Sequence, residues 1–281
     1  LTNAEMAHVG RFGSPEGIAK AKGEIVSELP DGGQAILNLD SPWFEQWYQL
    51  LGSKRTCCAF SLKNPTAQLR AEQIEIDSKG CPSFKLQSPA GEVQVSLQLR
   101  GQHNVANALA AAGAALAAGV SLECVSNGLA DLAPVAGRGN CCAGVAGAQV
   151  IDDSYNANPA SVKAAIDLLA GLQGTRILVL GDMGELGDWA ESSHTEVGEY
   201  ALEKGLDGLY AVGRLSALAV EAFGERGELF ASKDELVESL KGRLDISTQV
   251  LVKGSRSAGM DEVVAGLTAS ADTQNNDNRV S

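Results

Sequence analysis

The sequence lacks any long hydrophobic run. No stretch reaches the about 18 consecutive apolar residues of a membrane-spanning helix, so no span is predicted. The first residues, Leu1 to Met6, have neither a basic region nor a cleavage site, so they are not a signal peptide. We therefore expect a cytoplasmic protein.

Basic residues and metal-binding cysteine patterns are also scarce. The chain has 22 lysine and arginine residues against 35 acidic ones, a net charge of −13, which argues against a general nucleic-acid binder but leaves room for a local cationic pocket. Its six cysteines form no C-x-x-C pair and have no histidine close in sequence. We predict no zinc site and interpret them as small core residues of a reduced cytosolic protein.

Three common catalytic signatures are missing. Gly181, Gly184 and Gly187 do not form the G-x-G-x-x-G fingerprint, which argues against a dehydrogenase. No G-x-S-x-G motif supports an α/β-hydrolase. No Walker G-x-x-x-x-G-K-[ST] motif occurs, and the first residue is Leu1 rather than methionine. We interpret the chain as a fragment that starts inside a larger protein.

The second half of the sequence alternates between strand and helix patterns. Strands are predicted at 145–151, 176–180, 208–212, 228–231 and 248–252, with helices at 160–171, 189–204, 214–223, 233–242 and 257–267. Such alternation implies parallel strands joined by right-handed crossovers. The prediction is a doubly wound α/β domain of about 130 residues, a usual size for an independent core.

The first half has a different pattern. A helix at 15–29 is preceded by Ser14 and Pro15, a typical cap and first helical residue. Strands are predicted at 34–39, 56–62, 74–76, 83–86 and 93–99, the later ones as a small antiparallel meander, and helices at 105–118, capped by Asn104, and 122–129. The pattern changes at Arg138, which lies between two glycines. We place the domain boundary between 137 and 138 and expect a hinge there, and we expect a disordered tail at 269–281.

Polar residues follow three strands of the second half. The first strand runs into Asp152 and the motif D-S-Y-N-A-N-P, the second into G-D-M-G-E-L-G, and the strand at 248–252 into K-G-S-R. Ligands of parallel α/β sheets bind at the carboxyl ends of strands, so the three turns predict one binding rim. The alternative is that these turns only begin helices.

Eight short motifs along the chain resemble, in the same order, those of the Mur ligase family. They are His8 after Thr2-Asn3, Lys20-Ala21-Lys22-Gly23-Glu24, Asn38-x-Asp40, Gly101-x-His103-Asn104-x-x-Asn107, Gly137-Arg138, Asp153 to Pro159, Gly181 to Gly187 and Lys253-Gly254-Ser255-Arg256. The resemblance covers nearly the whole chain. It implies the latter part of a central ATPase domain, at 1–137, followed by a Rossmann-like C-terminal domain at 138–268.

The resemblance also implies an activity and its partners. The match is closest to the branch of the family that joins D-alanyl-D-alanine to a UDP-N-acetylmuramoyl-tripeptide, through an acyl phosphate made from ATP, in peptidoglycan precursor synthesis. Because the P-loop is missing, we expect little or no ligation by the fragment alone. We expect no nucleic-acid partner and a monomer.

Roles of individual residues follow from the resemblance alone. His8 and a carbamylated Lys22 would be catalytic ligands of Mg²⁺, which prefers oxygen ligands such as a carbamate supplies. The ATP-binding residues would be Asn107, Arg138, Asp153, Asn156 and Asn158. The residues that receive D-alanyl-D-alanine would be Asp182, Glu185, Lys253, Ser255 and Arg256.

Two other functions remain open at this point. A folylpolyglutamate-synthetase-type ligase shares H-N-x-x-N, although such enzymes typically carry D-G-A-H-N-P where this chain has Asp153 to Pro159. A non-catalytic nucleotide-binding module would keep part of the nucleotide surface and do no chemistry. The sequence does not identify the third residue of an accepted peptide.

Overall fold

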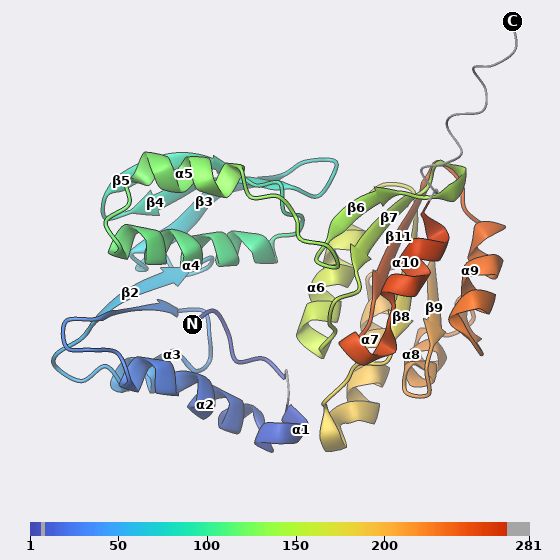
Figure 1. The fold of residues 1–281 in the computed structure, drawn as a ribbon, viewed down its shortest axis with the longest axis horizontal. Helices are drawn as coiled ribbons and strands as arrows, with labels where there is room; N and C mark the ends of the chain where they lie inside the picture. The colour runs from blue at the N-terminus through green and yellow to red at the C-terminus, as the bar shows by residue number, and fades with distance from the viewer. Residues whose placement is uncertain (7–8, 269–281) are drawn as a thin grey trace, which may run out of the picture. The chain divides into compact units, whose positions relative to one another are not determined.

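The computed structural model describes residues 1–6 and 9–268, which form two compact units (Figure 1). The first unit comprises Leu1–Pro134 and the short segment Glu185–Asp188, and the second comprises Val135–Gly184 and the chain from Trp189 onward. The predicted tail at 269–281 and His8 lie outside the described residues. Among the described helices, none combines the length and the apolar character that crossing a membrane requires.

The first unit contains one five-stranded mixed sheet in the order β1-β2-β3-β4-β5. Its strands are β1 (Gln34–Asn38), β2 (Thr56–Ser61), β3 (Leu69–Ile76), β4 (Pro82–Ser88) and β5 (Gly91–Ser96). The first three strands pair in parallel and the last three antiparallel. The predicted meander is confirmed for β3 to β5, whereas the parallel part of the sheet was not predicted.

The helices of this unit are α1 (Val9–Phe12), α2 (Pro15–Ser27), α3 (Phe44–Gln49), α4 (His103–Ala117) and α5 (Leu122–Ala130). Helices α3, α4 and α5 contact the sheet, whereas α2 contacts α1 and α3. The predicted cap of α2 is confirmed, because the Ser14 Oγ accepts a hydrogen bond from the Gly17 N–H at 3.1 Å. Helix α4 contacts β1 to β4, and its buried face joins a core that includes Phe60, Phe84 and Leu109.

The second unit is built on a six-stranded sheet in the order β10-β9-β8-β11-β7-β6. Its strands are β6 (Asn140–Ala143), β7 (Gln149–Asp153), β8 (Thr175–Gly181), β9 (Gly208–Val212), β10 (Gly227–Phe230) and β11 (Thr248–Lys253). All pairs are parallel except β6 with β7. The predicted doubly wound α/β fold is thereby confirmed.

Helices form two layers in this unit. They are α6 (Pro159–Ala170), α7 (Ala190–Glu203), α8 (Ser216–Phe223), α9 (Lys233–Lys241) and α10 (Asp261–Leu267). Side chains of α9 and α10 share a core with alternate strand residues such as Val150, Val179 and Val252. Neighbouring strand residues point to the opposite face. Helices α6 and α8 also contact the sheet, and α7 packs against both of them (Figure 1).

The prediction of a single strand at 145–151 was wrong. The chain instead forms a hairpin, with the antiparallel strand β6, a 3₁₀ turn η1 (Val145–Gly147) and then β7. Ala146 and Gly147 adopt positive φ values of 55° and 81°, and the Gly144 N–H donates to the Ala148 carbonyl at 2.8 Å. The turn is made of small apolar residues, so the sequence pattern at 145–151 resembles one buried strand. In the structure, the chain reverses direction within this run.

Two predicted helix starts also need correction. Helix α4 begins at His103, and the Asn104 side chain donates back to the Arg100 carbonyl at 2.7 Å instead of capping the helix. Helix α10 begins at Asp261, because the preceding 3₁₀ turn η3 (Arg256–Ala258) ends at Gly259 in the left-handed conformation. A left-handed residue interrupts the helical hydrogen bonding that the sequence pattern suggested.

Candidate functional site

The three polar turns lie at the ends of three adjacent strands. In the parallel register, Lys253 of β11 lies beside Asp153 of β7 on one side and Leu180 of β8 on the other. The prediction that these strand ends form one rim is therefore confirmed.

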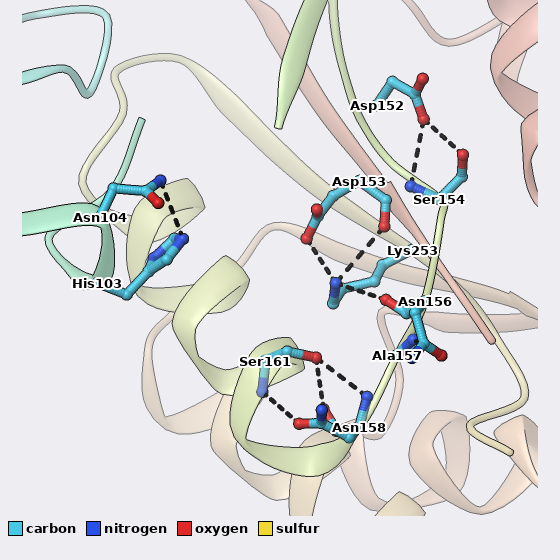
Figure 2. A network of polar contacts seen from close by, with 10 residues as sticks. All are labelled: His103, Asn104, Asp152, Asp153, Ser154, Asn156, Ala157, Asn158, Ser161 and Lys253. Atoms are coloured by element: carbon cyan, nitrogen blue, oxygen red, sulfur yellow. Dashed lines mark hydrogen bonds and ion pairs between the residues drawn. The ribbon is translucent and has the colours of Figure 1, made fainter. Parts of the chain in front are cut away.

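Lys253 is buried at this rim and ion-paired with Asp153. Its side chain is 3 % exposed, and the Nζ donates to the Asp153 Oδ2 at 2.6 Å and to the Asn156 carbonyl at 2.9 Å (Figure 2). The Asp153 carbonyl lies at 3.5 Å from the same Nζ. An ammonium group has three donors, and these three oxygens account for all of them.

Asp152 organises the turn that follows β7. Its Oδ1 accepts hydrogen bonds from the Ser154 Oγ at 2.6 Å and the Ser154 N–H at 3.2 Å (Figure 2). Its Oδ2 accepts from the Gly137 N–H at 3.0 Å, and its carbonyl accepts from the Gly139 N–H at 2.8 Å. The segment at Gly137 to Gly139 is thus tied to β7, and the hinge expected there stays a prediction.

Asn156 and Asn158 occupy different environments. The Asn158 side chain caps α6 by accepting from the Ser161 N–H at 2.9 Å, and the Ser161 Oγ accepts from the Asn158 N–H at 3.0 Å. This reciprocal pair is a capping box. The Asn156 side chain is exposed, with its Oδ1 accepting from the Ala157 N–H at 2.9 Å.

Two arginine side chains lie close to the ring of Tyr155. The Arg138 guanidinium carbon lies 4.3 Å from the centre of the Tyr155 ring, and that of Arg256 lies 5.8 Å from it. Arginines within about 6 Å of an aromatic ring centre are attracted by the negative face of the ring. All three residues are exposed, so the ring presents two cations at the surface of the rim.

Asp182 links the second turn to two other segments. Its Oδ1 accepts from the Leu215 N–H (3.1 Å), the Ser216 N–H (2.8 Å) and the Ser216 Oγ (2.7 Å), at the start of α8. Its carbonyl accepts from the Ser255 N–H at 3.0 Å. The Asp182 side chain therefore neutralises a helix amino terminus, where a carboxylate is favourable.

The remaining residues predicted on these turns are Ser255, Arg256 and Glu185. Ser255 is buried, and its Oγ lies 3.1 Å from the Ser257 Oγ. Glu185 is exposed and adopts a φ of 60°, which non-glycine residues rarely do.

His194 was missed by the sequence analysis. It is fully buried on α7, and its Nε2 accepts a hydrogen bond from the Met183 N–H at 2.9 Å. Its position could have been noticed, because His194 shares the buried face of α7 with Val197 and Ala201 at helical spacing.

Two predicted residues belong to the first unit. The Lys22 Nζ on α2 donates to the Asn3 carbonyl at 3.0 Å, and partial burial lowers the pKa of this amine, against the opposing effect of Glu5. Asn107 on α4 is exposed, and its Nδ2 donates to the Asn104 Oδ1 at 3.0 Å.

No ready-made metal site is present within residues 1–6 and 9–268, since no three His, Cys, Asp or Glu side chains come together there. Lys22 is an amine, and it suits a hard cation only after conversion to a carbamate. His8 lies outside the described residues.

Comparison with known proteins identifies related domains in both units. The Mur ligase middle domain matches residues 1–115, and the Mur ligase glutamate ligase domain matches residues 137–256. The UDP-N-acetylmuramoyl-tripeptide–D-alanyl-D-alanine ligase of Escherichia coli is 44% identical over 95% of this chain and 59% of its own length. The enzyme of the same name from Haemophilus influenzae is 37% identical over 95% of the chain and 58% of its own length.

Solved structures agree with these relatives. A crystal structure of MurF from Acinetobacter baumannii superposes with a TM-score of 0.87 at 34% identity, covering 94% of this chain and 58% of that one. A MurF ligase from Thermotoga maritima in complex with ADP has a TM-score of 0.79 at 22% identity and covers 94% of this chain and 61% of that one, which supports the fold alone. The chain thus spans somewhat more than half the length of the relatives it matches. With the two domain matches and these relatives, the chain belongs to the Mur ligase family.

Proposed function

We propose that this chain is the ATP- and dipeptide-handling part of a ligase that joins D-alanyl-D-alanine to a UDP-N-acetylmuramoyl-tripeptide. The observation that carries the proposal is the position of D-S-Y-N-A-N-P, G-D-M-G-E-L-G and K-G-S-R at three adjacent parallel strand ends. Relatives that are 44% and 37% identical bear the name of this activity.

The residues present suit ATP. In this proposal, MgATP supplies the phosphoryl group that activates the peptide carboxylate. Arg138 is held on Tyr155 with its charge exposed, as an anion-binding arginine requires. The Asp153 Oδ2 is fixed by Lys253, so this carboxylate can accept ribose hydroxyls from a constant position. Asn107 presents an exposed amide for a base edge, and Asn156 and Asn158 support the same turn.

Lys22 suits a magnesium site once it is carbamylated. Carbon dioxide reacts with a neutral amine, and burial already favours the neutral form of Lys22. The resulting carbamate would supply the oxygen ligand that Mg²⁺ prefers, with His8 as the second proposed ligand.

For the dipeptide, Arg256 is the better of the two cations. Lys253 has its three donors occupied by protein oxygens, whereas the Arg256 guanidinium is exposed beside Tyr155. We assign the dipeptide carboxylate to Arg256 because guanidinium binds carboxylates with two parallel hydrogen bonds. Ser255, Asp182 and Glu185 remain the other residues proposed to receive the dipeptide, and Lys253 acts through Asp153.

The remaining proposals concern organisation. Residues 1–137 would serve as part of the ATP-binding domain and 138–268 as the domain that delivers the dipeptide. We propose that the protein acts in the cytoplasm as a monomer, where its UDP-linked substrate and ATP are available.

The test is ligation by the protein that carries this chain. With ATP, Mg²⁺, the UDP-linked tripeptide and D-alanyl-D-alanine, it should release phosphate and form the pentapeptide, and omission of any one component should stop both. Turnover with a folate and glutamate instead would establish the folylpolyglutamate-type alternative. Binding of ATP without turnover of either pair would establish the non-catalytic module. The 281-residue chain assayed alone is expected to show little or no ligation.

A further inference from the structure

His194 joins helix α7 to the turn that follows β8. The imidazole Nδ1 lies 2.7 Å from the Ala190 carbonyl, one turn earlier in α7, and the Nε2 lies 2.9 Å from the Met183 nitrogen. A carbonyl can only accept and a backbone N–H can only donate. The two partners therefore require a neutral ring with its proton on Nδ1.

The turn that His194 contacts is held from three directions. Asp182 binds the start of α8 and the Ser255 N–H, while Met183 is bound to α7 through His194. A methyl group at Gly184 would lie 3.2 Å from the Ser255 Cβ, so the turn also packs tightly against the K-G-S-R segment. Fixing the Met183 amide thus fixes the turn relative to Ser255.

We propose that His194 is a positioning residue: as a neutral acceptor it holds the G-D-M-G-E-L-G turn against the K-G-S-R turn, and its protonation releases the G-D-M-G-E-L-G turn. The expectation that release of this turn weakens binding of D-alanyl-D-alanine rests on the proposed function. Protonation would place an N–H on Nε2 directly opposite the Met183 N–H, so an attractive contact would become a repulsion between two donors.

The surroundings favour the neutral ring. Burial lowers the pKa of His194, with the Ala190 carbonyl and the Asp182 carboxylate acting in the opposite direction. Helix α7 packs against α6 and α8. The charged groups of α6, Lys163 and Asp167, pair with Glu196 and Lys204, and α8 carries a single charged residue, Glu221. The remaining charged residues of α7 itself are Glu191, Glu199 and Glu203.

The first experiment needs no substrate. Long-range ¹H–¹⁵N spectra of the 281-residue chain at pH 7.5 should show His194 with a protonated Nδ1 and an unprotonated Nε2. The protection factor of the Met183 amide against hydrogen exchange should fall at least about tenfold over the same pH range in which these spectra show Nε2 becoming protonated, because the hydrogen bond to the ring is then lost. A protonated Nε2 at pH 7.5, or protection that is unchanged once Nε2 is protonated, would overturn the proposal.

The second experiment uses variants of the protein that carries the chain. In His194→Gln, the amide oxygen can accept from Met183 without titrating, whereas His194→Leu has no acceptor. We expect His194→Leu to raise KM for D-alanyl-D-alanine about tenfold at neutral pH with KM for ATP unchanged, as the loss of one positioned hydrogen bond would do. In the parent protein, the same KM should rise at acid pH as His194 becomes protonated. His194→Gln should keep a KM near the parent value at neutral pH and should not show this rise at acid pH.

Thr195→Val is the matched control. Thr195 follows His194 on α7 and its Oγ1 also donates to a carbonyl one turn earlier, that of Glu191, at 3.2 Å. The Thr195→Val substitution should change neither the KM for D-alanyl-D-alanine nor the pH dependence of this KM. Equal KM effects on both substrates in His194→Leu would indicate a merely structural role and overturn positioning. If the protein does not use D-alanyl-D-alanine at all, the proposed function fails, and the exchange experiment alone then decides the role of His194.

Discussion

Asp153 and Lys253 are direct neighbours across two parallel strands, with the Asp153 Oδ2 2.6 Å from the Lys253 Nζ. They lie one hundred residues apart in the sequence. The pair joins the D-S-Y-N-A-N-P turn to the K-G-S-R turn, so the position of each turn depends on the other. It also explains how a lysine can be almost fully buried at a strand end.

Replacing Lys253 should therefore cost stability. Lys253→Met leaves the Asp153 carboxylate and the Asn156 carbonyl without their donor, and breaking one side of a buried ion pair costs about 3–5 kcal/mol. Because Asp153 is 26 % exposed, we expect a value near the lower limit. Urea unfolding of the chain measures this change.

The control is Lys241→Met, since Lys241 pairs with Glu238 at 2.8 Å on the surface. An exposed pair contributes about 0–1 kcal/mol. Equal losses of unfolding free energy in the two variants would contradict the structural role that we give Lys253.

Lys22 should form a carbamate. When the chain is equilibrated with ¹³C-bicarbonate near pH 8, a ¹³C carbamate signal should appear and should disappear in Lys22→Ala but not in Lys20→Ala. Burial lowers the pKa of Lys22, so more of this amine is neutral and able to react than of an exposed lysine. Lys20, on the same helix, is exposed.

In the protein that carries the chain, Lys22→Ala should abolish ligation, and short carboxylates should restore part of it by replacing the carbamate. Near-normal ligation by Lys22→Ala would show that Lys22 is only a surface residue of α2.

The sequence was sufficient for the parallel strands of the second sheet and for the rim. Alternating strands and helices imply parallel pairing, and parallel strands place Asp153, Gly181 and Lys253 at one edge. It did not reveal the partners of these side chains. Lys253 was predicted to face a substrate, yet its three donors contact the protein, because contacts between residues one hundred positions apart leave no local pattern. The β6–β7 hairpin was missed for a different reason, since its turn is made of small apolar residues.

Gly213 should not tolerate a side chain. A methyl group there would lie 2.2 Å from the Asp182 Oδ1, and its φ is 133°. Gly213→Ala must therefore displace the carboxylate that binds the start of α8. Backbone strain and the lost helix cap together should lower the free energy of unfolding by about 2–3 kcal/mol.

Gly205→Ala is the control for backbone strain alone. Gly205 has a φ of 70°, and nothing lies within 4 Å of the added methyl group. The Gly205→Ala variant should lose about 1 kcal/mol of unfolding free energy. Thermal or urea unfolding compares the two, and similar losses would show that the Asp182 contact contributes little.

Gly137 should be more sensitive than Gly139, although both are glycines with similar φ values of 76° and 74°. A methyl group at Gly137 would lie 3.0 Å from the Tyr155 Cβ, whereas nothing lies within 4 Å of one at Gly139. Both alanine variants carry the same left-handed strain, so their difference isolates the contact with Tyr155. We expect Gly137→Ala to lose about 1 kcal/mol more than Gly139→Ala in urea unfolding, as overpacking by one methyl group does.

Displacing Tyr155 would also disturb the Arg138 guanidinium stacked on its ring, so Gly137→Ala should weaken ATP binding by the protein that carries the chain more than Gly139→Ala does. Calorimetric titration of the two variants with ATP measures this difference. Equal ATP affinities, together with equal stabilities, would mean that Gly137 only completes a turn and that Tyr155 does not position Arg138 for a phosphate.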